Sequence, residues 1–379
     1  MKRRIPRWLV IAAMPLFLAG FATRSPAANK AKKQLVKASA NTPAQPLAWP
    51  LPPEPPRIRW LDQFSKFDDV QQKKKKKRSW VEKLAGVSQE KEQDRSLTSP
   101  YGIAVDSQGR IYVADWSSGG ILVFDRTAHS VEVLGPQKGV PMRLPLGVAV
   151  DDQDRLFFSD AIFRTITCLS PEGKLLAQFG RDELERPSGL ALDQKRHRLY
   201  VADTKGHRVA VFNTQTFAFE KYLGKKSTDR EPGTFRFPTG VAVDRRGFLY
   251  VTDTFNYRVQ IFNPRGRFER EFGSHGDSPG QFSRPKGIAV DSEGHIYVAD
   301  AQFNNFQIFD QEGKVLLFVG TLGEAPGQFT LLTGLCIDDQ DRIYTTEQYR
   351  PRVQIFQYIA QPESAGAKEV SQKKRKQRP

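Results

Sequence analysis

The stretch of sequence that decides the fold is GIAVD-SQGR-IYVAD, residues 102–115. Five more copies follow, each with a glycine, a small apolar strand, an aspartate, a short turn and a second strand that ends in an acid. Successive copies are 45, 42, 51, 47 and 47 residues apart. Their opening glycines are Gly102, Gly147, Gly189, Gly240, Gly287 and Gly334. Repeats of this length with several short strands are typical of propeller blades. The sequence therefore predicts an all-β fold, a six-bladed β-propeller over residues 100–360.

The last blade lacks a fourth strand of its own. Alternation of apolar and polar residues predicts four strands in the fourth and fifth blades, but only three in the sixth, because a polar tail begins at Gln361. A separate strand pattern at residues 57–64 precedes the first blade. A ring of blades must join its ends, and an unpaired strand edge favours aggregation. We therefore predict that residues 57–66 close the ring, with 57–64 pairing against 352–358.

The net charge of +16 lies outside the repeats. Residues 1–56 carry 9 basic and 1 acidic side chains, residues 57–99 carry 12 and 7, and residues 361–379 carry 6 and 2. The repeats therefore hold the remaining 31 basic and 32 acidic side chains of the 58 and 42 in the chain. A domain that reads nucleic acid would carry a basic footprint itself. Nucleic acid is thus not the expected partner.

The N-terminal residues predict export. Residues 1–22 have a basic start and an apolar stretch that ends in small residues, which is the pattern of a signal peptide. The apolar stretch is shorter than the ~20 residues of a membrane-spanning helix. We expect a periplasmic or extracellular protein, with an uncleaved membrane tether as the alternative. Residues 23–56, rich in Ala, Pro and Lys, are predicted to be a flexible tether.

A basic linker with a short helix is predicted between the closing strand and the first blade. It covers residues 67–99, and the helix covers 79–86, where Ser79 and Glu82 have the spacing of a capping box. Six adjacent cations precede the helix: Lys73, Lys74, Lys75, Lys76, Lys77 and Arg78. This run is either a solvated linker or a docking site for an anionic membrane surface or an acidic partner. The basic tail at residues 361–379 is predicted to be disordered.

Two acids recur in every blade. The first closes the inner strand and has the chemistry of an ordinary hairpin turn. The second ends the second strand, at Asp115, Asp160, Asp203, Asp253, Asp300 and Glu347. We favour a structural role for this second set, because each acid precedes a loop whose amides it can bind and, in three blades, an arginine follows five residues later. The alternative is a ring of carboxylates that holds Ca²⁺ and thereby relieves their mutual repulsion.

The histidines and cysteines do not predict a catalytic site. The five histidines fall at different ends of the predicted blades, whereas a zinc site or a general base needs groups that converge. Cys168 and Cys336 occupy strand positions that are apolar in other blades, so we expect two buried free thiols; a disulfide is the alternative. We assign no catalytic residue and expect no cofactor, apart from the Ca²⁺ alternative.

One face of the predicted propeller carries side chains that the repeat does not share. Loops between the second and third strands lie at the same end as the loops between blades, because connections alternate ends. Recognition surfaces favour the aromatic and basic residues found there. The alternative is that some of these rings cover the channel or the inter-blade loops. The predicted ligand-binding face consists of Trp116, Phe163, Arg164, Lys205, His207, Phe255, Tyr257, Phe303, Tyr349 and Arg350.

The blades resemble NHL repeats. The best copies, residues 238–262 and 285–309, have the form P-x-G-[IV]-A-V-D followed by [IL]-Y-V-[AT]-D, and the spacer Pro-Gly-Gln-Phe occurs at 279–282 and 326–329. The resemblance covers residues 100–358 and implies a six-bladed propeller. Members of this family include extracellular sensor domains, protein and RNA binders, lyases and lactonases, so the fold does not select a function.

Two functions are therefore kept open. The first is an exported, non-catalytic module that binds a protein, a peptide or a cell-envelope polymer on the loop-rich face. The alternative is a lyase or lactonase that depends on Ca²⁺ or Zn²⁺ and has its site in the central channel. The channel lining discriminates between them. Convergent acids, Asn or His favour the enzyme, and an apolar or self-satisfied channel under an aromatic rim favours the binding module.

Overall fold

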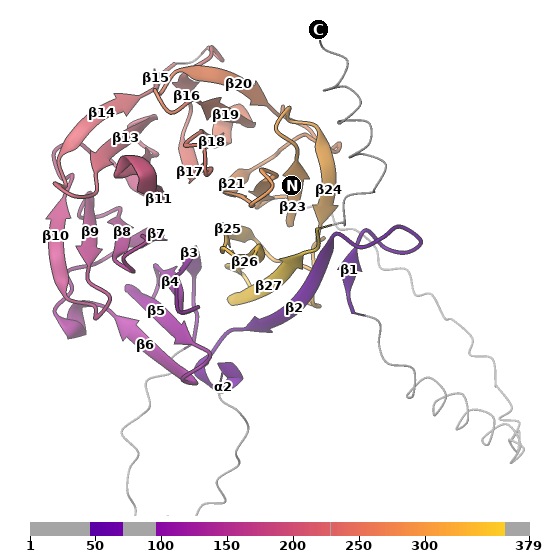
Figure 1. Cartoon of the computed structure of the whole chain (residues 1–379), viewed down its shortest axis with the longest axis horizontal. Coiled ribbons are helices and arrows are strands. Elements are labelled where there is room, and N and C mark those ends of the chain that lie inside the picture. Colours follow the sequence, from indigo (N-terminus) through magenta and orange to yellow (C-terminus); the bar gives the residue numbers. More distant parts are fainter. Residues whose placement is uncertain (1–45, 71–95, 228, 361–379) are drawn as a thin grey trace, which may run out of the picture. The chain divides into compact units, whose positions relative to one another are not determined.

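The protein is a six-bladed, all-β propeller, as the repeats predict. The computed structural model describes residues 46–70, 96–227 and 229–360. Six antiparallel sheets surround a central axis, each with its first strand innermost (Figure 1). In the described part of the chain, no helix is long and apolar enough to cross a membrane.

Five of the blades are four-stranded sheets of consecutive strands. The first contains β3 (Pro100–Val105), β4 (Ile111–Asp115), β5 (Gly120–Asp125) and β6 (Ser130–Leu134). The second contains β7 (Pro145–Val150), β8 (Leu156–Asp160), β9 (Thr165–Leu169) and β10 (Leu175–Phe179). The third contains β11 (Pro187–Asp193), β12 (Arg198–Asp203), β13 (Arg208–Asn213) and β14 (Phe219–Leu223). The fourth contains β17 (Pro238–Val243), β18 (Leu249–Asp253), β19 (Arg258–Phe262) and β20 (Phe268–Phe272). The fifth contains β21 (Pro285–Val290), β22 (Ile296–Asp300), β23 (Asn305–Phe309) and β24 (Val315–Val319).

The sixth blade joins the two ends of the described chain. It contains β25 (Leu332–Ile337), β26 (Arg342–Glu347), β27 (Arg352–Tyr358), β2 (Ile58–Phe64) and β1 (Ala48–Trp49). Strand β2 pairs antiparallel with β27, with Ile58 opposite Tyr358 and Phe64 opposite Val353. In Figure 1 the indigo β2 lies outside the yellow β27. The predicted closure of the ring by an N-terminal strand is confirmed.

The end of the predicted flexible tether needs correction. Residues 48–49 form β1 and pair with Arg59 and Ile58 of β2, which makes the last blade five-stranded. The Trp49 ring packs at 5.9 Å from the ring of Phe356, so apolar packing fixes this segment to the sheet. The other parts of the tether, the signal sequence, the predicted helix at 79–86, the run of six cations and the basic tail lie outside the described residues.

Short elements fill the connections. A helical turn α2 (Phe67–Val70) follows β2, and the short parallel pair β15 (Lys225–Lys226) and β16 (Thr234–Phe235) lies between the third and fourth blades. The 3-10 turns are η1 (Pro136–Lys138), η2 (Gln194–Arg196) and η3 (Thr254–Asn256). Phe235, Phe282 and Phe329 end the three long spacers and are fully buried. These rings anchor the spacers in the hydrophobic clusters of the blades.

The repeated glycines are required by the close approach of the inner strands. A Cβ atom on Gly147 would lie 2.0 Å from the main-chain oxygen of Ser188 in the next blade. The same approach recurs around the ring and ends with Gly334, whose Cβ would lie 2.1 Å from the Tyr101 oxygen. Real Cβ atoms do not come this close to a carbonyl, so only glycine lets the six inner strands meet around the axis. These glycines therefore build the ring.

Candidate functional site

The acid that ends each second strand holds the loops of one face. The Asp160 carboxylate accepts hydrogen bonds from the inter-blade amides of Arg143 (2.6 Å) and Leu144 (3.0 Å). It also accepts from Ile162 (2.9 Å) and Phe163 (2.8 Å) in the loop after β8. The corresponding acids in all six blades are buried and accept at least one inter-blade amide. In four blades the acid also bonds the loop after its own strand and so holds two loops together, at Asp115, Asp160, Asp253 and Asp300.

Arginines complete this arrangement in three blades. Arg208 bonds Asp203 at 3.1 Å, and Arg258 bonds Asp253 at 2.9 Å. Arg352 bonds Glu347 in the same way. Burial, the largest influence, raises the pKa of Asp253 despite the hydrogen bonds that it accepts. Within the described ranges, no three His, Cys, Asp or Glu side chains come together as a group that could hold a metal ion. The six carboxylates considered as an alternative Ca²⁺ site each bind loop groups next to their own strand instead.

A funnel opens on this face at the axis of the propeller. Its volume is about 480 Å³. The wall comes from the starts of the inner strands, the residues just before them and the loops after the second strands. The lining residues are Tyr101, Trp116, Leu144, Leu146, Arg186, Ser188, Thr204, Phe237, Thr239, Thr254, Phe255, Arg284, Lys286 and Gln348. We call this cavity the central funnel.

The central funnel is positively charged. Arg186, Arg284 and Lys286 line it, and no acidic side chain does. Nor does any of the three form an ion pair with another described residue. The Nζ atom of Lys286 lies 5.2 Å from the centre of the Tyr101 ring, a cation–π distance. Burial, together with the smaller effect of the charges of Arg284 and Arg186, lowers the pKa of Lys286 to about 8. An anion placed here would relieve this repulsion.

The hydroxyl groups of the wall are already engaged with each other. The Ser188 and Thr204 hydroxyls lie 2.7 Å apart, and so do those of Thr239 and Thr254. Beyond this level the channel narrows to a cavity of about 60 Å³ at the ring of repeated glycines. A ligand would therefore meet cations and aromatic rings at the mouth of the channel.

The structure places two residues of the predicted face in the central funnel. Trp116 and Phe255 line it and are 41% and 43% exposed. Lys205, Tyr349 and Arg350 are also exposed, but they do not line the funnel. The exposed part of the predicted face is thus split between the central funnel and the outer loops.

Two other predicted face residues, the buried His207 and the exposed Arg164, bond to inter-blade loops. His207 is only 5% exposed, and its Nδ1 accepts a hydrogen bond from the Phe237 amide at 3.2 Å. The Arg164 guanidinium donates to the main-chain oxygens of Leu184 (2.7 Å) and Arg181 (3.0 Å). The polar groups of both residues stabilise inter-blade loops, and their role as ligand contacts stays a prediction.

The aromatic residues Phe163, Tyr257 and Phe303 are half-buried. Tyr257 packs on the His275 ring at 4.3 Å, and Phe163 lines a separate small pocket of about 280 Å³. A left-handed backbone explains part of this arrangement, since φ is 60° at Arg164, 55° at His207 and 56° at Tyr257. Alternation along a strand does not predict side-chain direction at such a position.

Sequence reasoning missed the cations of the central funnel. Lys286 and Tyr101 occupy the variable position between the repeated proline and glycine, and Arg186, Phe237 and Arg284 directly precede that proline. Because these positions begin the inner strands, their side chains reach the channel mouth. The sequence signal for these residues is that they occupy positions of the repeat that vary between blades.

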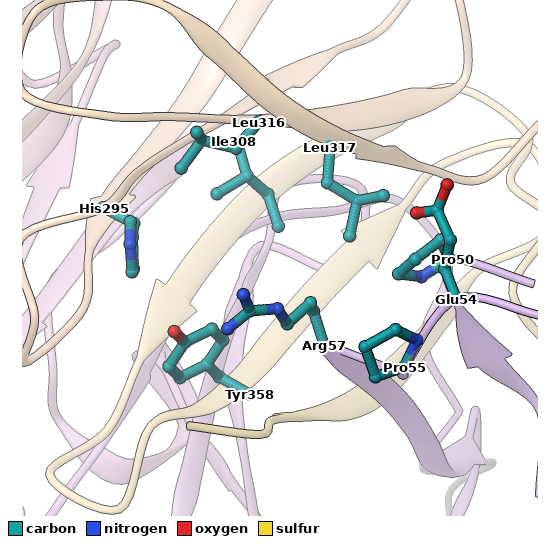
Figure 2. Close-up of a pocket in the computed structure, with 9 residues that line it drawn as sticks. All are labelled: Pro50, Glu54, Pro55, Arg57, His295, Ile308, Leu316, Leu317 and Tyr358. Carbon is teal, nitrogen blue, oxygen red and sulfur yellow. The ribbon is translucent and has the colours of Figure 1, made fainter. Parts of the chain in front are cut away.

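A second pocket lies beside the closing strand. Figure 2 shows Arg57 extending next to Tyr358, with Ile308 and Leu317 on the opposite side. The pocket measures about 550 Å³. Its histidine, His295, is bonded to Asp291 at 2.8 Å, which raises the pKa of His295. His295 and Tyr358 therefore bond to the neighbouring turn, at Asp291 and Glu293.

Neither cysteine offers a reactive thiol. Cys168 and Cys336 are free and lie in the second and sixth blades. Burial raises the pKa of Cys168 to about 12 and also raises that of Cys336. Cys168 is buried, as expected from the sequence, whereas Cys336 is half-buried. The thiolate is the nucleophilic form, and a raised pKa disfavours it in both residues.

Comparison with known proteins identifies the repeats. The NHL repeat matches residues 184–212, 235–262 and 282–309, and a β-propeller repeat matches residues 93–122. No relative was found among curated proteins by sequence.

Similar folds occur among solved structures. Virginiamycin B lyase from Staphylococcus aureus is 13% identical with a TM-score of 0.52, covering 69% of this chain and 96% of the lyase. A gluconolactonase from Xanthomonas campestris is 19% identical with a TM-score of 0.54, covering 69% and 87%. A chain of a nidogen/laminin complex is 18% identical with a TM-score of 0.52, covering 64% and 86%. At these identities the likeness concerns the fold alone. The repeats and the six blades together identify the chain as an NHL-repeat β-propeller.

Proposed function

We propose that this protein is a non-catalytic binding module that holds a protein or peptide partner, or a cell-envelope polymer, on its loop-rich face. The observation that carries the proposal is the central funnel. Exposed aromatic rings of Trp116, Phe237 and Phe255 surround a mouth that contains cations and no acids. Large aromatic side chains and arginine are the residues that contribute most to binding energy at interfaces.

The rigidity of the face supports the same proposal. The buried acids fix both kinds of loop to the blades, so little conformational entropy is lost when a partner binds. A metal-dependent lyase or lactonase would need convergent acids, Asn or His in the channel, whereas the funnel supplies apolar groups, paired hydroxyls and cations. A propeller of similar fold occurs in a nidogen/laminin complex, which is consistent with protein binding by such propellers.

We further propose that binding takes place outside the cytoplasm. The signal-like pattern of residues 1–22 supports export, and the run of six cations would orient the module at an anionic membrane surface. The neutral repeats would leave partner choice to the central funnel.

The test is a pull-down from a cell-envelope extract with the full chain. Replacing Trp116 and Phe255 together by alanine is expected to reduce partner capture at least about tenfold, because each aromatic anchor is worth more than about 1 kcal/mol. The matched control replaces Leu316 and Phe318 by alanine. These residues are 48% and 51% exposed, and they lie on the outer strand β24. Equal capture by wild type and both double variants would contradict the proposal.

A further inference from the structure

We propose that the central funnel is an anion-binding subsite, and that its ligand is a peptide segment in which an aspartate or glutamate lies beside an apolar or aromatic residue. This inference rests on the proposed function and names the chemistry of the partner. Arg186, Arg284 and Lys286 would receive the carboxylate, and the aromatic rim would receive the apolar neighbour.

The three cations converge from two blades. Lys286 belongs to the inner strand β21, Arg284 directly precedes it, and Arg186 precedes β11 of the third blade. Both arginines act electrostatically on Lys286 and also on Tyr101, whose ring faces the Lys286 ammonium group. The wall hydroxyls bond each other, whereas no ion pair among the described residues engages these three cations. Charge-assisted bonds from Arg or Lys to a carboxylate would satisfy them.

The size and charge of the surroundings favour a short acidic segment over a long polyanion. A cavity of about 480 Å³ admits a few side chains. The repeats carry 31 basic and 32 acidic side chains outside the extensions, so the surrounding surface offers no extended basic track. Trp116, Phe237 and Phe255 add an apolar rim that a phosphate backbone would not use. The complementary ligand is therefore a carboxylate next to an apolar group.

The ammonium group of Lys286 gives this subsite a pH dependence. Its pKa is lowered to about 8, and the groups that face it are Tyr101, Arg186 and Arg284. The cationic form attracts the carboxylate and predominates below that pKa, so affinity should be full near neutral pH and fall as the pH rises above about 8. An arginine at position 286 would stay charged over this range.

The experiment is a selection of random heptapeptides on the full-length protein, followed by titration of the tightest selected peptide. We expect enrichment of Asp or Glu beside an aromatic or large apolar residue. Lys286→Gln should weaken the selected peptide by about tenfold to a hundredfold, as expected for hydrogen bonds to a charged group. For wild type, affinity should fall about tenfold between about pH 7 and about pH 9.5. Lys286→Arg should retain binding and lose this pH dependence.

The possible outcomes separate the two proposals. Selected peptides that depend on Trp116 and Phe255 but are not enriched in acids would overturn the anion subsite and leave the binding module standing. Failure to select any peptide, together with binding of phosphatidylglycerol vesicles that Lys286→Gln abolishes, would overturn the peptide ligand in favour of a phosphate. Selected peptides whose affinity is unchanged by substitution of Trp116, Phe255 and Lys286 would overturn both proposals.

Discussion

Replacing Ile58 by aspartate is expected to destabilise the folded protein by about 4 kcal/mol or more, because a fully buried side chain is lost and an unpaired charge is buried in its place. Ile58 lies on β2, packs in the cluster shared by the fifth and sixth blades, and pairs with both β1 and β27. Since β2 joins the N-terminal segment to the last blade, its loss would open the ring. The expected fall in melting temperature is roughly 10 °C or more, measured by calorimetry.

The matched control is Arg59→Asp. Arg59 is the next residue of the same strand, but its side chain is exposed on the other face. Its substitution should change the free energy of unfolding by less than about 1 kcal/mol. If Ile58→Asp and Arg59→Asp melted at the same temperature, closure of the ring by β2 would be contradicted.

Replacing Arg258 by methionine is expected to cost about 3–5 kcal/mol, because it leaves a buried carboxylate without its partner. Arg258 is fully buried, and its guanidinium bonds Asp253 at 2.9 Å. It also donates to the main-chain oxygens of Glu231 (3.0 Å) and Thr234 (2.8 Å), so it fixes the spacer that leads to Phe237 in the central funnel. Loss of Arg258 should therefore weaken both stability and partner binding.

Two measurements distinguish loss of the buried Arg258–Asp253 pair from loss of an exposed Arg–Asp pair. Arg246→Met removes another Arg–Asp pair of the same blade, but its side chain is 58% exposed, so the cost should stay below about 1 kcal/mol. The Arg258→Met variant should also regain stability as the pH falls. Burial already raises the pKa of Asp253, and without Arg258 the folded protein would favour the protonated carboxyl still more. A loss that is small and independent of pH would contradict the anchoring role of Arg258.

The fold was predictable because the repeat specifies one blade six times. Each copy contains its own glycine, turn acid and strand alternation, and the missing outer strand made the role of β2 clear. Strand β1 was not predictable, because two residues carry no periodic signal and its position depends on the contact of Trp49 with Phe356. Tertiary packing, which a local pattern does not contain, decides such a segment.

The residues of the predicted face differ in how far the sequence indicates their surroundings. Trp116 and Phe255 follow second strands, and both are exposed in the central funnel. His207 and Arg164 have a left-handed backbone, and their side chains form inter-blade hydrogen bonds that the strand pattern does not predict. Lys286 was not predicted because it lies at the variable position of the repeated Pro-x-Gly frame, between two residues that build the blade. Variable positions within a repeated frame are therefore the places to search for function in a propeller.

The most direct test of the account asks which surface the partner touches. A photoreactive phenylalanine analogue would be introduced at position 255 in the central funnel, or at position 318 on the outer strand β24, and crosslinked in a cell-envelope extract. We predict a discrete crosslinked partner from position 255, competed by the selected acidic peptide, and none from position 318. Crosslinking of the partner from position 318 and not from position 255 would contradict the assignment of the loop-rich face as the binding surface.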